Sequence, residues 1–193
     1  MNAGICGLVL AGGQGRRMGG VDKGLQSLQG QPLIRHVIDR LRPQVDGVMI
    51  NANQNLERYA EFGCPVLPDR IGGFAGPLAG LDAGLHATAA PLIVTAPCDS
   101  PFLPHDLVAR LAAARSAADA DVAVARTGGQ PHPVFALVST RVRSHLADFL
   151  ARGERKIDLW YATLKVVEVA FDDEADAFAN INTRAELAQH DRR

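Results

Sequence analysis

A short apolar run that leads into a glycine-rich loop constrains the fold of this chain more than any other feature. Residues 5–10 read Ile-Cys-Gly-Leu-Val-Leu, without alternation of apolar and polar side chains. This pattern is typical of a strand buried on both faces of a parallel sheet. The loop at 11–20 follows at once. An apolar helical stripe within 31–42 and a second apolar run at 48–50 then complete the strand–helix–strand order of a parallel β-α-β unit.

The rest of the chain continues this alternation, without an internal repeat or a long linker. We predict a single Rossmann-like three-layer α/β/α domain over residues 1–193, with a mostly parallel sheet. The expected strands are 66–67, 92–95, 122–125, 134–138 and 164–169, and the expected helices are 78–87, 104–114 and 140–151, with a capping box at 183–186 opening a last helix. A glycine pair at 128–129 predicts a turn that makes the strands at 122–125 and 134–138 antiparallel neighbours.

Composition narrows the class of partner. The chain has 20 Lys and Arg against 21 Asp and Glu, a net charge of −1, whereas nucleic-acid binders usually carry a basic excess. We therefore expect a small-molecule partner and no nucleic acid. No apolar run approaches the roughly 18 residues that span a bilayer, so we expect no membrane contact and a cytoplasmic location. Cys6, Cys64 and Cys98 are widely spaced and predict neither a disulfide framework nor a zinc site.

The loop after the first strand suits a polyphosphate. Its glycines let backbone N–H groups turn inward and let a phosphate approach the main chain closely. Arg16, Arg17 and Lys23 add three cations. The loop is not a Walker A loop, because no Gly-Lys-Ser/Thr occurs, and Met18 stands where a dinucleotide fingerprint has its third glycine. The loop therefore predicts phosphate binding of another kind.

A single carboxylate follows the buried strand at 92–95. Asp99 lies in the segment Pro-Cys-Asp-Ser-Pro at 97–101, with no cation close to it in the sequence. Ligands of open α/β sheets bind beyond the carboxyl ends of strands, and a carboxylate is the usual protein ligand of Mg²⁺ beside substrate phosphates. We predict that Asp99 binds Mg²⁺.

Three further segments carry weaker signals. Gly-Pro-Leu-Ala-Gly at 76–80 opens a helix, and the N–H groups at a helix start suit an anion or a base edge. Asn180 and Asn182 flank an isoleucine, so their amides point the same way if the segment is extended. His132 precedes a proline at the start of a strand, and we expect it to make a structural hydrogen bond rather than to transfer protons.

Taken together, these motifs resemble the molybdenum cofactor guanylyltransferases, the MobA family, over nearly the whole chain. The motifs that carry the resemblance are Leu-Ala-Gly-Gly-x-x-x-Arg-Met-Gly-Gly-x-Asp-Lys-Gly-Leu at 10–25, Gly-Pro-Leu-Ala-Gly at 76–80, Pro-Cys-Asp-x-Pro at 97–101, His-Pro-Val-Phe at 132–135 and Asn-Ile-Asn-Thr at 180–183. The first motif is shared with a wider set of nucleotidyltransferases. The resemblance implies that the Rossmann-like sheet is of the nucleotide-diphospho-sugar transferase kind.

The resemblance also assigns roles by position. The residues it places at the nucleotide and its metal are Leu10, Ala11, Gly12, Gly13, Gly15, Lys23 and Asp99. Those that would hold the nucleoside are Asn51 and Asp69, and those that would lie against guanine are Gly76, Pro77 and Leu78. Asn180 and Asn182 would lie on the side of the pterin acceptor. The candidate catalytic groups, which would neutralise charge during phosphoryl transfer, are Arg17, Lys23 and Asp99.

The activity that the resemblance implies is a Mg²⁺-dependent transfer of GMP from GTP to molybdopterin or Mo-molybdopterin, with release of pyrophosphate. We expect a monomer, with cofactor-assembly proteins and molybdoenzyme chaperones as further candidate partners. Two alternatives stay open: a cytidylyltransferase for the same acceptor and, in a different class, a non-catalytic nucleotide-binding assembly subunit. The second is disfavoured because Asp99 and both asparagines are retained.

Overall fold

The computed structural model describes residues 4–13, 22–72, 76–181 and 186–187 of the chain. Within these ranges the strands are β1 (Ile5–Leu10), β2 (Ser27–Leu28), β3 (Gln31–Pro32), β4 (Gly47–Asn51), β5 (Val66–Leu67), β6 (Leu92–Pro97), β7 (Val122–Thr127), β8 (Gln130–Ser139) and β9 (Val166–Ala170). The α-helices are α1 (Leu33–Leu41), α2 (Leu56–Ala60), α3 (Pro77–Ala87), α4 (Leu107–Ala118), α5 (Arg143–Ala151) and α6 (Ile157–Tyr161). The 3₁₀ helices are η2 (Lys23–Leu25), η3 (Arg42–Gln44), η4 (Thr140–Val142) and η5 (Asp172–Phe178).

The main sheet has the strand order β5-β4-β1-β6-β8-β7-β9. β1 is parallel to β4 and β6, β4 is parallel to β5, and β7 is parallel to β9. Only β8 runs the other way among the strands of this sheet, because it is antiparallel to both β6 and β7. The mostly parallel sheet is therefore confirmed, as is the antiparallel β7–β8 pair around the glycine turn.

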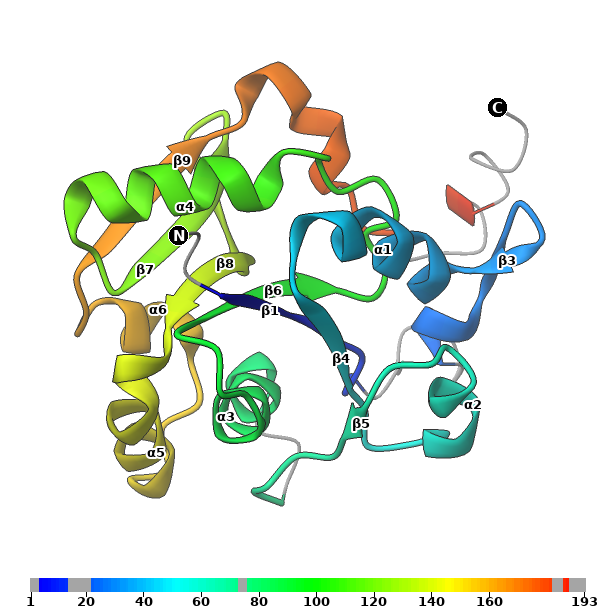
Figure 1. The fold of residues 1–193 in the computed structure, drawn as a ribbon, viewed down its shortest axis with the longest axis horizontal. Helices are drawn as coiled ribbons and strands as arrows, with labels where there is room; N and C mark the ends of the chain where they lie inside the picture. The colour runs from blue at the N-terminus through cyan, green and yellow to red at the C-terminus, as the bar shows by residue number, and fades with distance from the viewer. Residues whose placement is uncertain (1–3, 14–21, 73–75, 182–185, 188–193) are drawn as a thin grey trace.

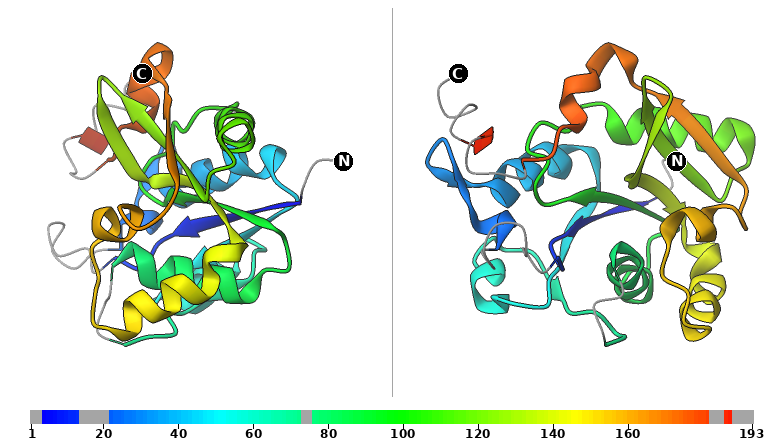
Figure 2. Two further views of the ribbon diagram at one scale, coloured as in Figure 1. Left: turned by 90° about the vertical axis from the view of Figure 1, so that its left-hand side faces the viewer. Right: turned by 180° about the vertical axis from the view of Figure 1, so that it is seen from behind.

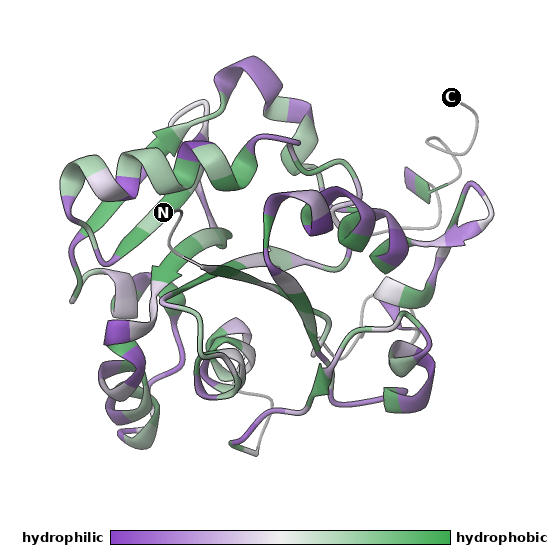
Figure 3. Cartoon of the chain, viewed as in Figure 1, coloured by the Kyte–Doolittle hydropathy of each residue, from purple (hydrophilic) through white to green (hydrophobic). Residues whose placement is uncertain are grey.

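Helices cover both faces of the sheet and make three layers (Figures 1 and 2). α1 and α4 lie on one face, and α3 and α5 lie on the other. Each helical layer closes its own apolar core over the sheet. β1 contributes to both, since Val9 packs in the α1/α4 core and Leu8 packs in the α3/α5 core, with both side chains fully buried. Figure 3 shows the apolar strands at the centre and polar positions mainly on the outer helices and loops. The expected α/β/α architecture is confirmed.

The element bounds differ from the sequence expectation in several places. α1 begins at Leu33 rather than at residue 31, because Gln31 and Pro32 pair with β2 in a two-stranded ladder. α4 runs from Leu107 to Ala118, later than the predicted 104–114. The five-residue helices α2 and α6 were not predicted, because so short a segment has too few residues to display helical periodicity.

Strand order reverses at β1 and β6. The chain moves outward from β1 to β4 and β5, and then returns to place β6 on the other side of β1. Such a switch point leaves a crevice beyond the carboxyl ends of the two strands, because the connections leave them in opposite directions. The glycine-rich loop follows β1 and Asp99 follows β6, so the topology brings these two predicted features to one edge.

An aromatic cluster joins β8 to η5. The rings of His132 and Phe178 stack, with centroids 4.8 Å apart and planes 13° apart. Phe135 and Phe171 meet Phe178 edge-on at centroid distances of 4.9 and 5.2 Å. His132 Nε2 is hydrogen-bonded to Thr127 Oγ1 at 2.7 Å, which confirms the predicted structural hydrogen bond. Burial lowers the pKa of His132, because charging the ring is unfavourable in this apolar setting.

We predict that His132→Gln reduces the loss of stability on acidification. Because its pKa is lowered in the fold, the unfolded chain binds a proton on this ring more readily than the folded protein does. This difference destabilises the fold as pH falls from the ordinary value of 6.5 toward the lower folded pKa, and it is absent at higher pH. Urea unfolding at about pH 7.5 and about pH 5.5 measures it. His105→Gln, at an exposed histidine, is the control. An unchanged acid response in His132→Gln would contradict the prediction.

Candidate functional site

Backbone hydrogen bonds hold three loops together at the carboxyl edge of the sheet. Cys98 N donates to Leu10 O at 3.1 Å, and Ala11 N donates to Asn51 O at 2.8 Å. The segments that leave β1, β4 and β6 therefore lie side by side. Leu10, Ala11 and Gly12, which were predicted at the nucleotide, occupy the middle of this edge. Of the other predicted loop residues, Gly13 is exposed, whereas Gly15 and Arg17 lie outside the described residues.

An ion pair lies at the centre of the site. Lys23, in η2, places its Nζ 3.2 Å from Oδ2 of Asp99, and the two side chains are 23% and 11% exposed. The two residues are 76 positions apart in the sequence, and only the fold brings the predicted phosphate-binding cation to the predicted metal ligand. Burial raises the pKa of the adjacent Cys98 thiol, and the Asp99 carboxylate raises it further. The thiol therefore stays neutral, and a nucleophilic role does not suit it.

The candidate site is not a closed metal cage. No group of three or more His, Cys, Asp and Glu side chains that could hold a metal occurs in the described part of the chain. Mg²⁺ usually keeps several waters and binds one or two carboxylates together with substrate phosphates. A largely buried carboxylate beside an ammonium group, such as that of Asp99 beside Lys23, would suit that mode of binding.

A network of amides and one carboxylate lies beyond β4. Asn51 Nδ2 donates to Asp69 Oδ1 at 2.9 Å and to Leu67 O at 3.1 Å. Asn53 Nδ2 donates to Asp69 Oδ2 at 2.8 Å, and Asp69 N donates to Asn53 Oδ1 at 2.9 Å. The structure thus brings together Asn51 and Asp69, which were predicted to hold the nucleoside. Asn53 was missed, and its only sequence signal is its position two residues after Asn51 at a strand end.

Helix α3 begins beside this network. Gly76 takes the left-handed φ of 73° that precedes the helix, a conformation favoured by glycine. Pro77 is exposed, but the Leu78 side chain is fully buried in the core, so Leu78 presents only backbone to a ligand. Gly80 packs directly against the site, because a Cβ there would lie 2.7 Å from Asn51 Cγ and 2.7 Å from Leu10 Cδ2.

The loop carrying Asp69 is also tied to α3. Arg70 Nη1 lies 3.1 Å from Oδ2 of Asp82, a helix residue whose side chain is only 4% exposed. His86 Nδ1 lies 3.3 Å from the other carboxylate oxygen. Sequence analysis did not identify this cluster, since nothing in the local pattern links residue 70 to residue 82. The pair fixes the Asp69 loop against the helix that begins at the site.

The C-terminal segment closes the opposite side of the site. Ser100 Oγ donates to Asn180 Oδ1 at 2.5 Å, and Ile181 N donates to Asp99 O at 2.8 Å. Ile181 is buried with Leu28. The predicted Asn180 thus lies directly beside the Asp99 loop, and Ser100 is a further polar residue that the analysis of the sequence missed. Asn182 lies outside the described residues.

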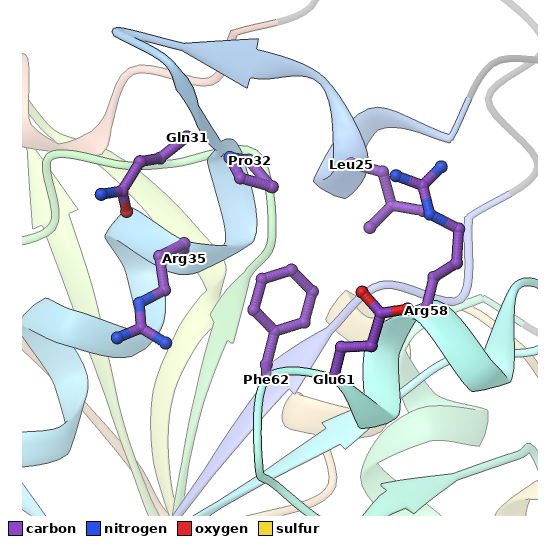
Figure 4. A pocket seen from close by; sticks show the side chains of 7 residues that line it. All are labelled: Leu25, Gln31, Pro32, Arg35, Arg58, Glu61 and Phe62. Carbon is purple, nitrogen blue, oxygen red and sulfur yellow. The ribbon is translucent and has the colours of Figure 1, made fainter.

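A hollow beside η2 is separate from these groups. It is lined by Leu25, Gln31, Pro32, Arg35, Arg58, Glu61 and Phe62, and in Figure 4 the Phe62 ring points up between the sides formed by Pro32 and Leu25. None of these seven residues is a predicted site residue. The hollow adjoins the candidate site through Leu25, which belongs to the same short helix as Lys23.

A family model and the curated relatives agree on one family. Residues 7–165 match the MobA-like NTP transferase domain. The molybdenum cofactor guanylyltransferase of Cupriavidus necator is 55% identical over 194 residues, covering 98% of this chain and 97% of the relative. The enzyme of the same name from Shewanella loihica is 49% identical, with 98% and 96% covered. No helix in the described ranges is both long and apolar enough to cross a membrane.

Solved structures support the fold. Molybdopterin-guanine dinucleotide biosynthesis protein A from Archaeoglobus fulgidus is 25% identical, with a TM-score of 0.80 and 97% of each chain covered. The 4-diphosphocytidyl-2C-methyl-D-erythritol synthase from Anaerococcus prevotii is only 10% identical but has a TM-score of 0.74, with 98% of this chain and 95% of that chain covered. The second likeness concerns the fold alone. The expected nucleotide-diphospho-sugar transferase kind of fold is confirmed.

We predict that Gly80→Ala destabilises the protein by about 1–3 kcal/mol, the usual cost of overpacking. The new methyl group would collide with Asn51 and Leu10, whereas glycine to alanine in a helix interior otherwise stabilises by about 1 kcal/mol. Urea unfolding measures the change. Gly47→Ala is the matched control, because a Cβ at that exposed glycine meets nothing within 4 Å. A stabilised Gly80→Ala protein would contradict the close packing of α3 on the site.

Proposed function

This chain belongs to the family of MobA-like NTP transferase domains, and we propose that it is a Mg²⁺-dependent molybdenum cofactor guanylyltransferase. It transfers GMP from GTP to molybdopterin and releases pyrophosphate. The observation that carries the proposal is the ion pair of Lys23 and Asp99 at 3.2 Å. That pair lies at the switch point, between the Asn51–Asp69 network and Asn180. The names of the relatives support the choice of nucleotide and acceptor.

The reaction requires little acid–base chemistry from the protein. An oxygen of the terminal phosphate of molybdopterin forms a bond to the α-phosphorus of GTP, while the bond from that phosphorus to the bridging oxygen of pyrophosphate breaks. The attacking oxygen is already ionised near neutral pH. The barrier therefore arises mainly from repulsion between anions and from charge that develops on the leaving group, which positioning and electrostatics reduce.

Each group at the site has a task in this scheme. The backbone at 10–13 and the Lys23 ammonium would bind the phosphates, and Asp99 would hold the metal. Mg²⁺, when bound, neutralises charge on the phosphate oxygens and the leaving pyrophosphate. Arg17 is a further candidate for charge neutralisation from its place in the same loop.

The two partners of the reaction would approach from opposite sides of Asp99. Asn51 and Asp69 hold the nucleoside, and the start of α3 lies against guanine through its backbone. Asn180, bonded to Ser100 beside Asp99, would face the acceptor. With the partners so arranged, the acceptor phosphate would attack the α-phosphorus from the side opposite the leaving pyrophosphate, as an in-line displacement requires.

We predict that GTP, and not CTP, supports transfer to molybdopterin. The purified protein is incubated with molybdopterin, Mg²⁺ and either nucleotide, and pyrophosphate release and the dinucleotide product are measured. Rates with GTP should exceed those with CTP by more than tenfold, a difference of about 1.4 kcal/mol in transition-state binding. A preference for CTP would establish the cytidylyltransferase alternative. Nucleotide binding without any turnover would instead favour a non-catalytic assembly subunit.

We predict that Asp99→Ala abolishes turnover and that Lys23→Ala slows it by more than tenfold. Loss of the metal ligand removes several kcal/mol of transition-state stabilisation, and loss of the ammonium removes one neutralising charge. The control is Asp39→Ala, which breaks a surface ion pair with Arg35 whose side chains are 40% and 50% exposed. Steady-state kinetics at saturating Mg²⁺ provide the test. Near-normal turnover of Asp99→Ala would refute its assignment as the metal ligand.

A further inference from the structure

We propose that Tyr59 and Asp22 are positioning residues for GMP transfer, because together they fix the backbone from which Lys23 reaches Asp99. The proposal rests on the proposed function, since it concerns how a phosphate-binding cation of that reaction is aimed. The orientation of Lys23 by this contact can be measured without any turnover.

The Asp22 carboxylate is held on both of its oxygens. Tyr59 Oη donates to Oδ1 at 2.5 Å, and Asn55 Nδ2 donates to Oδ2 at 3.0 Å. Tyr59 is fully buried in α2, so its hydroxyl presents a fixed donor. Burial raises the pKa of Tyr59, and the neighbouring Cys98 and Asp22 raise it further. The phenol therefore stays protonated, and its hydrogen bond to a carboxylate belongs to the stronger, charge-assisted kind.

The residue on the other side of Lys23 is also fixed. A Cβ at Gly24 would lie 2.8 Å from Tyr59 Oη and 3.2 Å from Cys98 Sγ. The Gly24 backbone therefore rests directly on the same hydroxyl that holds Asp22. Lys23 lies between Asp22 and Gly24, and both of these neighbours contact the buried hydroxyl of Tyr59.

This arrangement limits where the Lys23 ammonium can go. A lysine side chain has four flexible carbons and carries about 2 kcal/mol of rotamer entropy, so its direction depends on how well its backbone is held. Misplacement of a substrate-positioning group by about 1 Å can cost on the order of 100-fold in rate.

Two tyrosines make a matched pair for the test. Tyr59→Phe removes only the hydroxyl that holds Asp22. Tyr161→Phe removes a comparable buried hydroxyl, which donates to Pro133 O at 2.8 Å and lies outside the site. Both changes remove one hydrogen bond of a buried phenol, so both should lower the urea midpoint, and Tyr59→Phe should lower it more because its acceptor is charged. Only Tyr59→Phe should change the behaviour of Lys23.

The first measurement does not depend on activity. Competitive labelling with acetic anhydride, followed by mass spectrometry, reports how freely the Lys23 amine reacts. We expect at least threefold faster labelling of Lys23 in Tyr59→Phe than in the wild type, and no change in Tyr161→Phe. Equal labelling in all three proteins would overturn the positioning role, even if the wild type transfers GMP.

The second measurement is kinetic. Tyr59→Phe should lower kcat at least tenfold in the GMP-transfer assay, with a smaller change in KM for GTP, while Tyr161→Phe retains kcat. If Tyr59 acts through Lys23, the double variant Tyr59→Phe/Lys23→Ala should be no slower than Lys23→Ala alone, since coupled residues are not additive. Additive losses would overturn the proposal. If Lys23 is labelled faster in Tyr59→Phe but the wild type does not transfer GMP, the positioning contact stands and the proposed function is rejected.

Discussion

The parallel pairing of β1 with β6 is the constraint on which the site depends. Both strands lie in the middle of the sheet, and β1 is buried on both faces. Groups that can meet a ligand therefore lie in the loops at the strand ends. Leu10 pairs with Pro97 in this ladder, and one further hydrogen bond joins Cys98 to Leu10. The glycine-rich loop and Asp99 therefore start from adjacent points at one edge, although many residues separate them in the chain. A switch point at the same edge leaves room there for a ligand.

The ion pair of Lys23 and Asp99 is better explained by function than by a contribution to stability. Removing two charges from water costs several kcal/mol each, so a largely buried pair is weak evidence of stabilisation. Two opposite charges at one point instead provide partners for both a phosphate and a metal ion. The Tyr59–Asp22 hydrogen bond would serve the same function indirectly, because it holds the backbone beside Lys23 rather than a substrate.

The fold alone would not have identified the reaction. An enzyme of cytidyl chemistry, only 10% identical, shares this architecture with a TM-score of 0.74, as expected where function depends on sites rather than on folds. The side chains around Asp99 make up the candidate site. On one side Asn51 and Asp69 are joined in a network with Asn53, and on the other Asn180 is bonded to Ser100.

The amino-acid sequence by itself determined the buried β1 strand, the cationic glycine-rich loop and the carboxylate after β6, because periodicity, turn chemistry and charge are local properties. Only the tertiary structure decided which of these groups meet. The partner of Asp99 lies 76 residues away, and the phenol that holds Asp22 lies in the five-residue helix α2. So short a helix has no periodic signal and is stabilised by packing rather than by propensity. Contacts between distant segments follow from strand order and from the filling of the core, which no local pattern records.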